Sequence, residues 1–363
     1  MADRSSWSHY ATVTTNTAKI SGTSTEIVGY LDLSELDATF FSNAKADGSD
    51  IVIVPSGETT DENKLPRELV GFSTSTNEGQ LFFGPITVTS ATSTSWDVWV
   101  GNASAAETNS TSVWSQYVAV YHLEEDPSGT APQMSDSTVN EHDLTTRGSM
   151  SSGDSVTGKI GNSLDLDGDD DGLDADDTVI HPNTSFTFMV WVKTPDKSDN
   201  MMICGNGNNT NGWYFFYLSG EDIWRFNLGG FAGFRLDMPF SVYDITNNTW
   251  AHVCGRLDID GSTNTVSFIM DGEEKATDTV STTTTTPSNN LYAGYYGTAD
   301  RLNWLGEIDE FRIYDGAMSD DQVATEYEQQ NDPASFWTYG STQSTGEPPT
   351  TPEQNALFFG GGA

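Results

Sequence analysis

Residues 306–328 read GEIDEFRIYDGAMSDDQVATEYE, and this stretch predicts a strand, a turn and a short closing helix. Apolar residues placed among charged ones favour a strand as far as Tyr314, and Asp315-Gly316 supplies residues typical of a turn. Ser319 is a suitable N-cap, and the acidic residues after it suit the positive start of a helix. Val323 and Tyr327 then lie at i, i+4 spacing on one helix face.

The chain before this stretch consists of short apolar runs separated by turn residues, which predicts strands rather than helices. In residues 7–102 the run Ile51-Val52-Ile53-Val54 lies between Gly48-Ser49-Asp50 and Pro55-Ser56-Gly57, as expected for a buried strand. The small polar segment ASAAETNSTSV (103–113) indicates a boundary. A second series follows and includes VWSQYVAVYHL, WYFFYLS, TWAHVCGRLDI and LYAGYYG.

The second series resembles the laminin-G-like, concanavalin-A-like jelly-roll family over about residues 117–330. The resemblance depends on a set of segments in the family's order, which ends in the opening stretch: YVAVYHLEED, SDSTVNEHDLT, GKIGNSLDLDGDDDGLDADD, SFTFMVWVKT, NTWAHVCGRLD, NTVSFIMDGEE and GEIDEFRIYDGAMSDDQVATEYE. Through DGSDIVIV, KLPRELVGF and VWVGN, residues 7–102 more weakly resemble an uncharacterised β-domain of prokaryotic and viral surface proteins.

We therefore expect an all-β protein with a short C-terminal helix. Residues 1–112 would form an N-terminal β-sandwich that could serve as an anchor, and residues 113–338 a concanavalin-A-like jelly roll. Residues 339–363 would form a Pro/Thr-rich linker and an apolar tail. In that tail Leu357, Phe358 and Phe359 follow a polar tether, which suggests a peptide that docks on a neighbouring protein, with a disordered end as the alternative.

The charge of the chain is strongly negative, with 15 Lys+Arg against 53 Asp+Glu and a formal net charge of −38. Such a surface repels nucleic acid and anionic lipid, so neither is an expected partner. Molar salt shortens the Debye length to about 3 Å and screens this self-repulsion. We therefore expect a halophilic source, with an acidic extracellular protein from a less saline setting as the alternative.

The N-terminus MADRSSWSHYATVTT contains no apolar region typical of a secretory signal, and no apolar run is long enough to span a bilayer. An extracellular protein of this kind would reach the outside by another route, such as assembly into a virus particle. Two cysteines, Cys204 and Cys254, do not make a disulfide framework. We expect buried free thiols, and a bond only if their strands are neighbours.

The resemblance implies a structural calcium, held by an Asp in a turn and by the Asp of the final strand. The matching positions are Asp136, Asn140 and Asp309, although Thr138-Val139 replaces the glycine common in that turn. Calcium takes six to eight oxygen ligands. The alternative is an Asx-turn without metal.

Residues 164–177 (LDLDGDDDGLDADD) begin like an EF-hand loop, but Thr178 stands where position 12 needs Glu. The family instead predicts a strand, a solvated acidic turn and a second strand there. A looser calcium site formed by the carboxylates of this turn stays open as an alternative.

Carbohydrate binding is the main functional prediction for the jelly roll, because its relatives often stack sugars on aromatic side chains. The candidates are Trp213, Tyr214, Trp224, Tyr292, Tyr295, Tyr296 and Trp304. The alternative is that they pack in the core, since alternate residues of a strand face opposite sides of its sheet.

An enzyme is not expected. Glu307 and Asp309 share one face of a strand, as catalytic carboxylates of some sandwich glycosidases do, but no second Glu follows at the next position of that face. The sequence therefore predicts a non-enzymatic structural protein on the surface of a virion that infects a halophilic archaeon. It would be a homo-oligomeric spike, turret or fibre subunit that contacts other virion proteins and host glycans. The competing prediction is a secreted adhesin or carbohydrate-binding module of a halophile.

Overall fold

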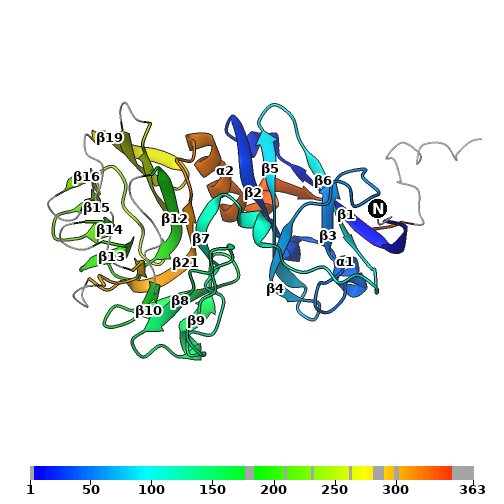
Figure 1. Ribbon diagram of the computed structural model, residues 1–363, viewed down its shortest axis with the longest axis horizontal. Helices are drawn as coiled ribbons and strands as arrows, with labels where there is room; N and C mark the ends of the chain where they lie inside the picture. Colours follow the sequence, from blue (N-terminus) through cyan, green and yellow to red (C-terminus); the bar gives the residue numbers. More distant parts are fainter. Residues whose placement is uncertain are drawn as a thin grey trace, which may run out of the picture.

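The computed structural model describes residues 4–175, 184–207, 211–229, 233–260, 264–280, 290–297 and 302–345. It confirms the all-β prediction: antiparallel sheets form two domains that lie side by side along the long axis of the molecule, with helix α2 (Asp320–Asn331) between them (Figure 1). No helix among the described residues is both long enough and apolar enough to cross a membrane.

The N-terminal domain packs one sheet of order β22-β1-β6-β3, with β23 also paired to β1, against a sheet of order β2-β5-β4. Its strands are β1 (His9–Thr15), β2 (Thr23–Asp32), β3 (Val52–Pro55), β4 (Arg67–Ser73), β5 (Glu78–Thr89), β6 (Ser95–Val100), β22 (Trp337–Tyr339) and β23 (Gln343–Ser344). Its helices are η1 (Arg4–Ser6), η2 (Thr17–Lys19), η3 (Leu33–Glu35), α1 (Ala38–Asn43) and η4 (Thr111–Trp114). Alternate residues of β1 are buried, as expected for a strand with one face on the core.

The chain returns to this domain after the jelly roll. Trp337–Tyr339 pair with Thr15–Val13 of β1, and Gln343–Ser344 pair with Tyr10–His9. Phe336 and Trp337 are buried in the same apolar cluster as Phe83 and Trp96. Residues 333–345, which the sequence assigned to the end of the jelly roll and to an extended tail, therefore complete the N-terminal domain, and the jelly roll is inserted into it.

The jelly roll consists, in the described residues, of an eight-stranded sheet of order β19-β18-β17-β12-β21-β10-β9, with β7 also paired to β21, and a seven-stranded sheet of order β16-β15-β14-β13-β20-β11-β8. The first contains β7 (Tyr117–Tyr121), β9 (Ser155–Thr157), β10 (Asn162–Asp167), β12 (Phe186–Lys193), β17 (Ala251–Asp258), β18 (Asn264–Met270), β19 (Glu273–Val280) and β21 (Leu305–Tyr314). The second contains β8 (Leu144–Arg147), β11 (Gly172–Ala175), β13 (Asn200–Gly205), β14 (Trp213–Leu218), β15 (Ile223–Leu228), β16 (Phe234–Pro239) and β20 (Tyr292–Ala293). The short helices η5 (Ser152–Asp154) and α3 (Pro333–Phe336) complete the described elements.

The closing helix forms where the sequence predicted it. Ser319 caps α2 by accepting a hydrogen bond from the Gln322 backbone N–H at 3.2 Å, and the Gln322 side chain accepts one from the Ser319 backbone N–H at 2.8 Å. Cys204 and Cys254 are free and buried, as expected.

The two domains share one apolar cluster. Val28, Tyr30 and Phe82 of the N-terminal domain pack with Met189 and Cys254, which lie in strands of the eight-stranded sheet. The outer face of that sheet is therefore covered by the N-terminal domain and by α2. An apolar interface of this kind opposes relative motion of the domains.

Candidate functional site

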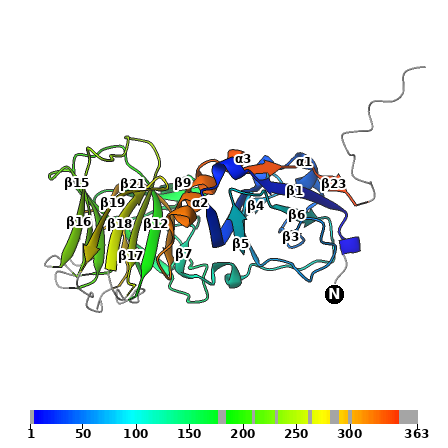
Figure 2. The same cartoon turned by 90° about the horizontal axis from the view of Figure 1, so that it is seen from above.

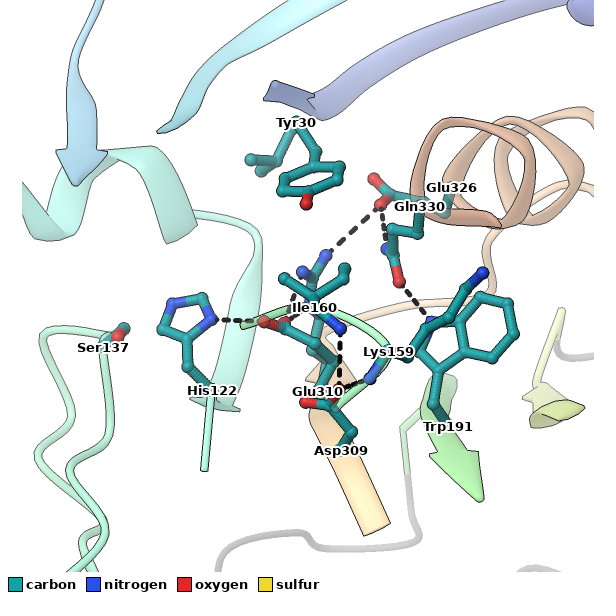
Figure 3. A network of polar contacts seen from close by, with 12 residues as sticks. Tyr30, His122, Ser137, Lys159, Ile160, Trp191, Asp309, Glu310, Glu326 and Gln330 are labelled. Carbon is teal, nitrogen blue, oxygen red and sulfur yellow. Dashed lines mark hydrogen bonds and ion pairs between the residues drawn. The ribbon is translucent and has the colours of Figure 1, made fainter. Parts of the chain in front are cut away.

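A network of buried charged side chains lies within this interface, and β21 supplies its centre (Figure 3). Met189 of β12 pairs with Arg312, but Trp191 pairs with Asp309, so β21 contains one extra residue between the two pairs. Glu310 lies in this bulge with φ of +49°, which is uncommon for a residue other than glycine. The bulge allows the consecutive side chains of Asp309 and Glu310 both to reach the interface.

His122, just after β7, bridges carboxylates of the two domains. Its Nδ1 lies 2.8 Å from Oε1 of Glu310, and its Nε2 lies 3.3 Å from Oε2 of Glu68 in β4. Ser137 donates a hydrogen bond to the other Glu68 oxygen at 2.9 Å, and the Trp114 indole also donates to Glu68. Both ring nitrogens of His122 therefore face acceptors, which favours the doubly protonated ring.

Arg312 is the second buried cation. Its Nε and Nη2 donate to Oε2 of Glu310 at 2.9 and 2.5 Å, and its Nη1 lies 3.4 Å from Oε2 of Glu326 in α2. Its guanidinium also lies over the rings of Phe82 and Trp114, at 5.2 and 5.0 Å from their centroids. Arg312 therefore connects the jelly roll to α2 and to the N-terminal domain.

Two glutamines of α2 form further hydrogen bonds at the domain interface. Gln329 donates to the Val28 carbonyl at 2.7 Å and accepts from the Tyr30 N–H at 2.9 Å, so its amide pairs with β2 as a neighbouring strand would. Gln330 accepts from the Trp191 indole at 2.7 Å (Figure 3). These contacts satisfy backbone and indole groups that the interface removes from water.

The charges of the network compensate one another. Burial opposes protonation of His122, but the charge of Glu310 and the hydrogen bonds that His122 donates to Glu310 and Glu68 outweigh it and raise its pKa to about 10. Burial likewise opposes ionisation of Glu310, yet His122 and Arg312 hold its pKa below the usual value. Burial raises the pKa of Glu326, which Arg312 partly offsets. Such a closed network can fix the domains in one arrangement, and it offers no group to a substrate.

Asp309 lies at the edge of the network and is fully buried. Its Oδ2 accepts the backbone N–H groups of Lys159 and Ile160 at 2.7 and 2.9 Å (Figure 3). Oδ1 contacts no donor among the described residues. Burial raises the pKa of Asp309 well above its usual value, and the charge of Glu310 adds to this effect.

The predicted calcium ligand Asp136 belongs to a different group of contacts. Its Oδ1 accepts the N–H groups of Val120 and Thr138 at 3.0 Å each, and its Oδ2 accepts the Thr138 hydroxyl at 2.8 Å and the His142 N–H at 3.0 Å. Asn140 donates its side-chain N–H to the Val118 carbonyl at 2.8 Å. These contacts form the Asx-turn that the sequence offered as the alternative to calcium.

Strand register separates Asp136 from Asp309. Val120, which binds Asp136, pairs with Arg312, three residues beyond Asp309 on β21. At about 3.3 Å per residue, the backbone position that binds Asp136 therefore lies roughly 10 Å along the sheet from the position opposite Asp309. Calcium binding by Asp136, Asn140 and Asp309 stays a prediction, and the described contacts of Asp136 and Asn140 are all with protein groups.

The acidic stretch folds as a strand, a turn and a strand, since β10 ends at Asp167 and β11 begins at Gly172. Asp167 accepts the N–H groups of Asp169 and Asp170 at 2.8 and 3.3 Å within the turn. Carboxylate oxygens of Asp167, Asp170 and Asp171 lie within 4.8 Å of one another. Asp167 and Asp170 are exposed and Asp171 is buried, and exposed acidic groups are common without an ion, so the looser calcium site stays untested.

The predicted glycan-binding aromatics lie in the interior. Trp213, Trp224 and Trp304 belong to the main core of the jelly roll and are fully buried. The four tyrosines are also buried: Tyr214, Tyr292, Tyr295 and Tyr296. In this conformation the rings pack within the protein and offer no open face to a sugar, so the described structure gives no support to these residues as stacking platforms.

Two predictions remain: the docking residues of the tail and the two acids of the final strand. Leu357, Phe358 and Phe359 lie outside the described residues, so docking of the tail stays a prediction. Glu307 forms an ion pair with Lys193 at 2.5 Å, and Asp309 is buried at the domain interface. The two acids are thus engaged in separate contacts within the protein.

Sequence reasoning missed His122, Glu310, Arg312 and Glu326. One signal was present: charged residues interrupt apolar strands in YVAVYHLEED and EIDEFRIY. A charge within such a strand has to be paired when it is buried, but the partners come from distant segments that the sequence does not place together.

Comparison with known proteins agrees with the jelly roll. Residues 167–324 match the family model described as the Concanavalin A-like lectin/glucanases superfamily, and this match agrees with the two-sheet fold of that part of the chain. No curated protein matches the chain.

Solved structures that the chain is similar to include the binding domain of Paraclostridial Mosquitocidal Protein 1, with a TM-score of 0.46 and 14% identity over 59% of this chain and 52% of that chain. The receptor binding domain of botulinum neurotoxin C/D mosaic serotype gives 0.46 and 13% over 60% and 52%. The receptor binding domain of botulinum neurotoxin type G gives 0.44 and 15% over 59% and 51%. The matches span about half the length of these proteins, and likeness at this level carries no functional argument.

Proposed function

We propose that this protein is a non-enzymatic surface protein that displays its lectin-like jelly roll for adhesion to glycans. In the finer form of the proposal it is a homo-oligomeric spike, turret or fibre subunit on the virion of a halophilic archaeal virus, held by other virion proteins. The jelly roll would contact host glycans. The second candidate is a secreted adhesin or carbohydrate-binding module of a halophilic microbe.

The observation that carries the proposal is the position of the two ends of the described chain. The Thr345 N–H donates to the Ser8 carbonyl at 2.9 Å, and β23 pairs with the start of β1. This pole of the N-terminal domain lies at the opposite end of the molecule from the jelly roll (Figures 1 and 2). A partner that holds the chain near either end therefore leaves the jelly roll pointing away from the attachment.

The sealed interface adds to this argument. Because the charged network and the shared apolar cluster cover one face of the jelly roll, the domain is presented in a fixed orientation. Strands β13 to β16 of its seven-stranded sheet lie on the side away from the N-terminal domain (Figure 1). Fixed presentation suits adhesion, since binding then costs little further ordering.

The acidic surface supports display in concentrated salt. A net charge of −38 favours solubility and opposes contact with nucleic acid or anionic membranes. Recognition of a neutral glycan depends on hydrogen bonds and apolar contact, which salt screens less than contact between exposed charges.

A glycan array probed with the full chain in molar KCl tests the adhesion part of the proposal. We expect a restricted set of saccharides to be retained, without hydrolysis of the array. An array without binding would remove adhesion and leave display alone. Release of reducing sugars would contradict a non-enzymatic role. Neighbouring capsid, portal or tail genes would support the virion over the secreted adhesin, and secretion genes would oppose it.

A further inference from the structure

A cavity in the N-terminal domain, distant from the jelly roll, has the features of a small-ligand site. It has a volume of about 640 Å³ and is lined by the loop 45–49, by β4 and by residues 106–109. Ligand sites in proteins typically measure about 300–1,000 Å³ and combine apolar walls with a few polar groups. Leu69 and Phe72 form the apolar part here, and Lys45, Asp47 and Arg67 are among the polar residues.

The apolar part of the cavity is held in place. The half-buried Phe72 ring stacks on Phe41, with 5.9 Å between centroids and 18° between planes. Gly48, with φ of +61°, brings the loop close over this wall, since a Cβ there would lie 2.2 Å from Leu69 Cδ2. The ring is therefore a pre-positioned apolar surface.

The hydrogen bonds that the polar groups already make argue against two kinds of ligand, an anion and an extended peptide. The donors of Arg67 are already engaged: Nε with the Ile51 carbonyl, Nη1 with Asn109 and Nη2 with the Gly48 carbonyl, at 2.9–3.1 Å. Few of its five N–H groups are therefore left to bind an anion. Asn109 also pairs with both the N–H and the carbonyl of Leu69, at 2.9 and 3.0 Å, so a peptide cannot extend the sheet there.

What stays available is one donor and one acceptor beside the apolar wall. Lys45 donates to the Ala105 carbonyl at 2.7 Å, which uses one of its three N–H groups. Ser49 donates twice to Oδ1 of Asp47, whereas no described residue donates to Asp47 Oδ2. A sugar hydroxyl can accept from the lysine while a neighbouring one donates to the carboxylate.

The charge of the lining also points to a neutral ligand. Lys45 and Arg67 balance Asp47 and Glu107, although the chain as a whole carries −38. From the apolar wall, the free donor and acceptor and this balance, we infer that the cavity binds a neutral saccharide, with its apolar face on Phe72 and a vicinal diol between Lys45 and Asp47. This site is separate from the jelly roll and does not depend on the jelly roll's ligand.

The test is a titration of the full chain with methyl hexopyranosides of the gluco, galacto and manno series in molar KCl. The readout is the backbone amide resonances of Ser49 and Asn109, which line the cavity. We expect saturable shifts in the unaltered protein. Asp47→Asn keeps an oxygen for Ser49 but loses the free acceptor, and should weaken binding roughly tenfold or more. Phe72→Leu should weaken it as well.

Asp126→Asn is the matched control. Asp126 is exposed in the jelly roll and accepts two hydrogen bonds from Ser128 just as Asp47 does from Ser49, so the charge and the turn change alike. This variant should bind as the unaltered protein does. Three results would overturn the inference. The resonances of Ser49 and Asn109 do not shift with any of the three sugars, Asp47→Asn binds the sugar as tightly as the unaltered protein, or these resonances shift with phosphate but with no sugar. Shifts confined to the jelly roll would also overturn it and would leave the proposed function standing.

Discussion

His122 contacts carboxylates of both domains, and its loss should weaken the seal between them. We expect His122→Leu to lower the free energy of unfolding by about 3–5 kcal/mol, because Glu310 and Glu68 then lose the buried cation that lies between them. His9→Leu, near the pole where the described chain ends meet, serves as the control for loss of a histidine.

The effect of His122→Leu should depend on pH. The pKa of His122 rises from 6.5 to about 10 in the folded protein. A raised folded pKa gives a contribution that is complete below pH 6.5 and is lost as the pH rises toward 10. Denaturant unfolding in molar KCl near pH 6 and near pH 10 should show a smaller difference between variant and parent at the higher pH. A difference that does not change with pH would contradict a charged His122.

Two substitutions of Asp309 distinguish the free-energy cost of burying its charge from the stability that its hydrogen bonds contribute. Asp309→Asn keeps an oxygen for the N–H groups of Lys159 and Ile160 and removes the charge. Since the folded pKa is raised, the stability that Asp309 contributes falls as the pH rises through that value. We expect Asp309→Asn to be at least as stable as the parent at pH 8, and Asp309→Ala to lose about 1–3 kcal/mol by leaving two N–H groups unpaired. Equal losses in both variants would contradict this account.

Removal of divalent cations tests the prediction that Asp136 helps to bind a structural calcium. Four protein donors already satisfy its carboxylate. We therefore expect a chelator of divalent cations to leave the melting temperature unchanged in molar KCl. A drop that calcium restores and magnesium does not would bring back the predicted structural ion.

At the scale of elements, β22 and β23 show where the limit of sequence reasoning lies. Trp337 packs among the aromatics of the N-terminal core, and its indole donates to the Tyr30 carbonyl at 2.6 Å. A chain that ends at residue 345 should unfold as the full protein does. A chain that ends at residue 332 should lose the cooperative unfolding of the N-terminal domain, measured by near-ultraviolet circular dichroism. Equal unfolding of the two would show that these strands are dispensable.

Local signals predicted some elements well. The cap of α2, the strand run at 51–54 and the turn between β10 and β11 depend on neighbours in sequence, and their residues could be recognised directly. The pairing of His9 with Ser344 joins the two ends of the described chain. The short polar segments 337–339 and 343–344 form strands because they pair with β1. The sequence does not show that β1 is their partner.

The candidate site was predicted less well for a similar reason. Sequence patterns place Glu307 and Asp309 on one face of a strand, but they do not predict the bulge at Glu310 or its contact with His122, which is 188 residues away in the chain. The sequence allows Trp213 and Trp224 either to bind sugar or to pack in the core. Only the position of the facing sheet, which the sequence does not give, shows that they pack in the core.

At the scale of the whole molecule, the charge of −38 should make stability depend on salt. The Debye length is about 10 Å at 0.1 M and about 3 Å at 1 M salt, so repulsion between surface carboxylates grows on dilution. We expect the melting temperature to fall steadily as KCl is lowered from molar concentration to about 0.1 M. A melting temperature that is independent of KCl would contradict a protein adapted to salt.

Display of the jelly roll away from the chain ends is tested most directly by comparing two orientations of the protein on a glycan array in molar KCl. Beads would carry the full chain either through a tag after residue 363 or through Asp278→Cys on β19 of the jelly roll. Asp278 is exposed while Cys204 and Cys254 are buried, which makes the coupling selective. We expect beads coupled through the tag to be retained by glycans and beads coupled through the jelly roll not to be retained. Equal retention in both orientations, or none in either, would contradict display of a glycan-binding jelly roll away from the chain ends.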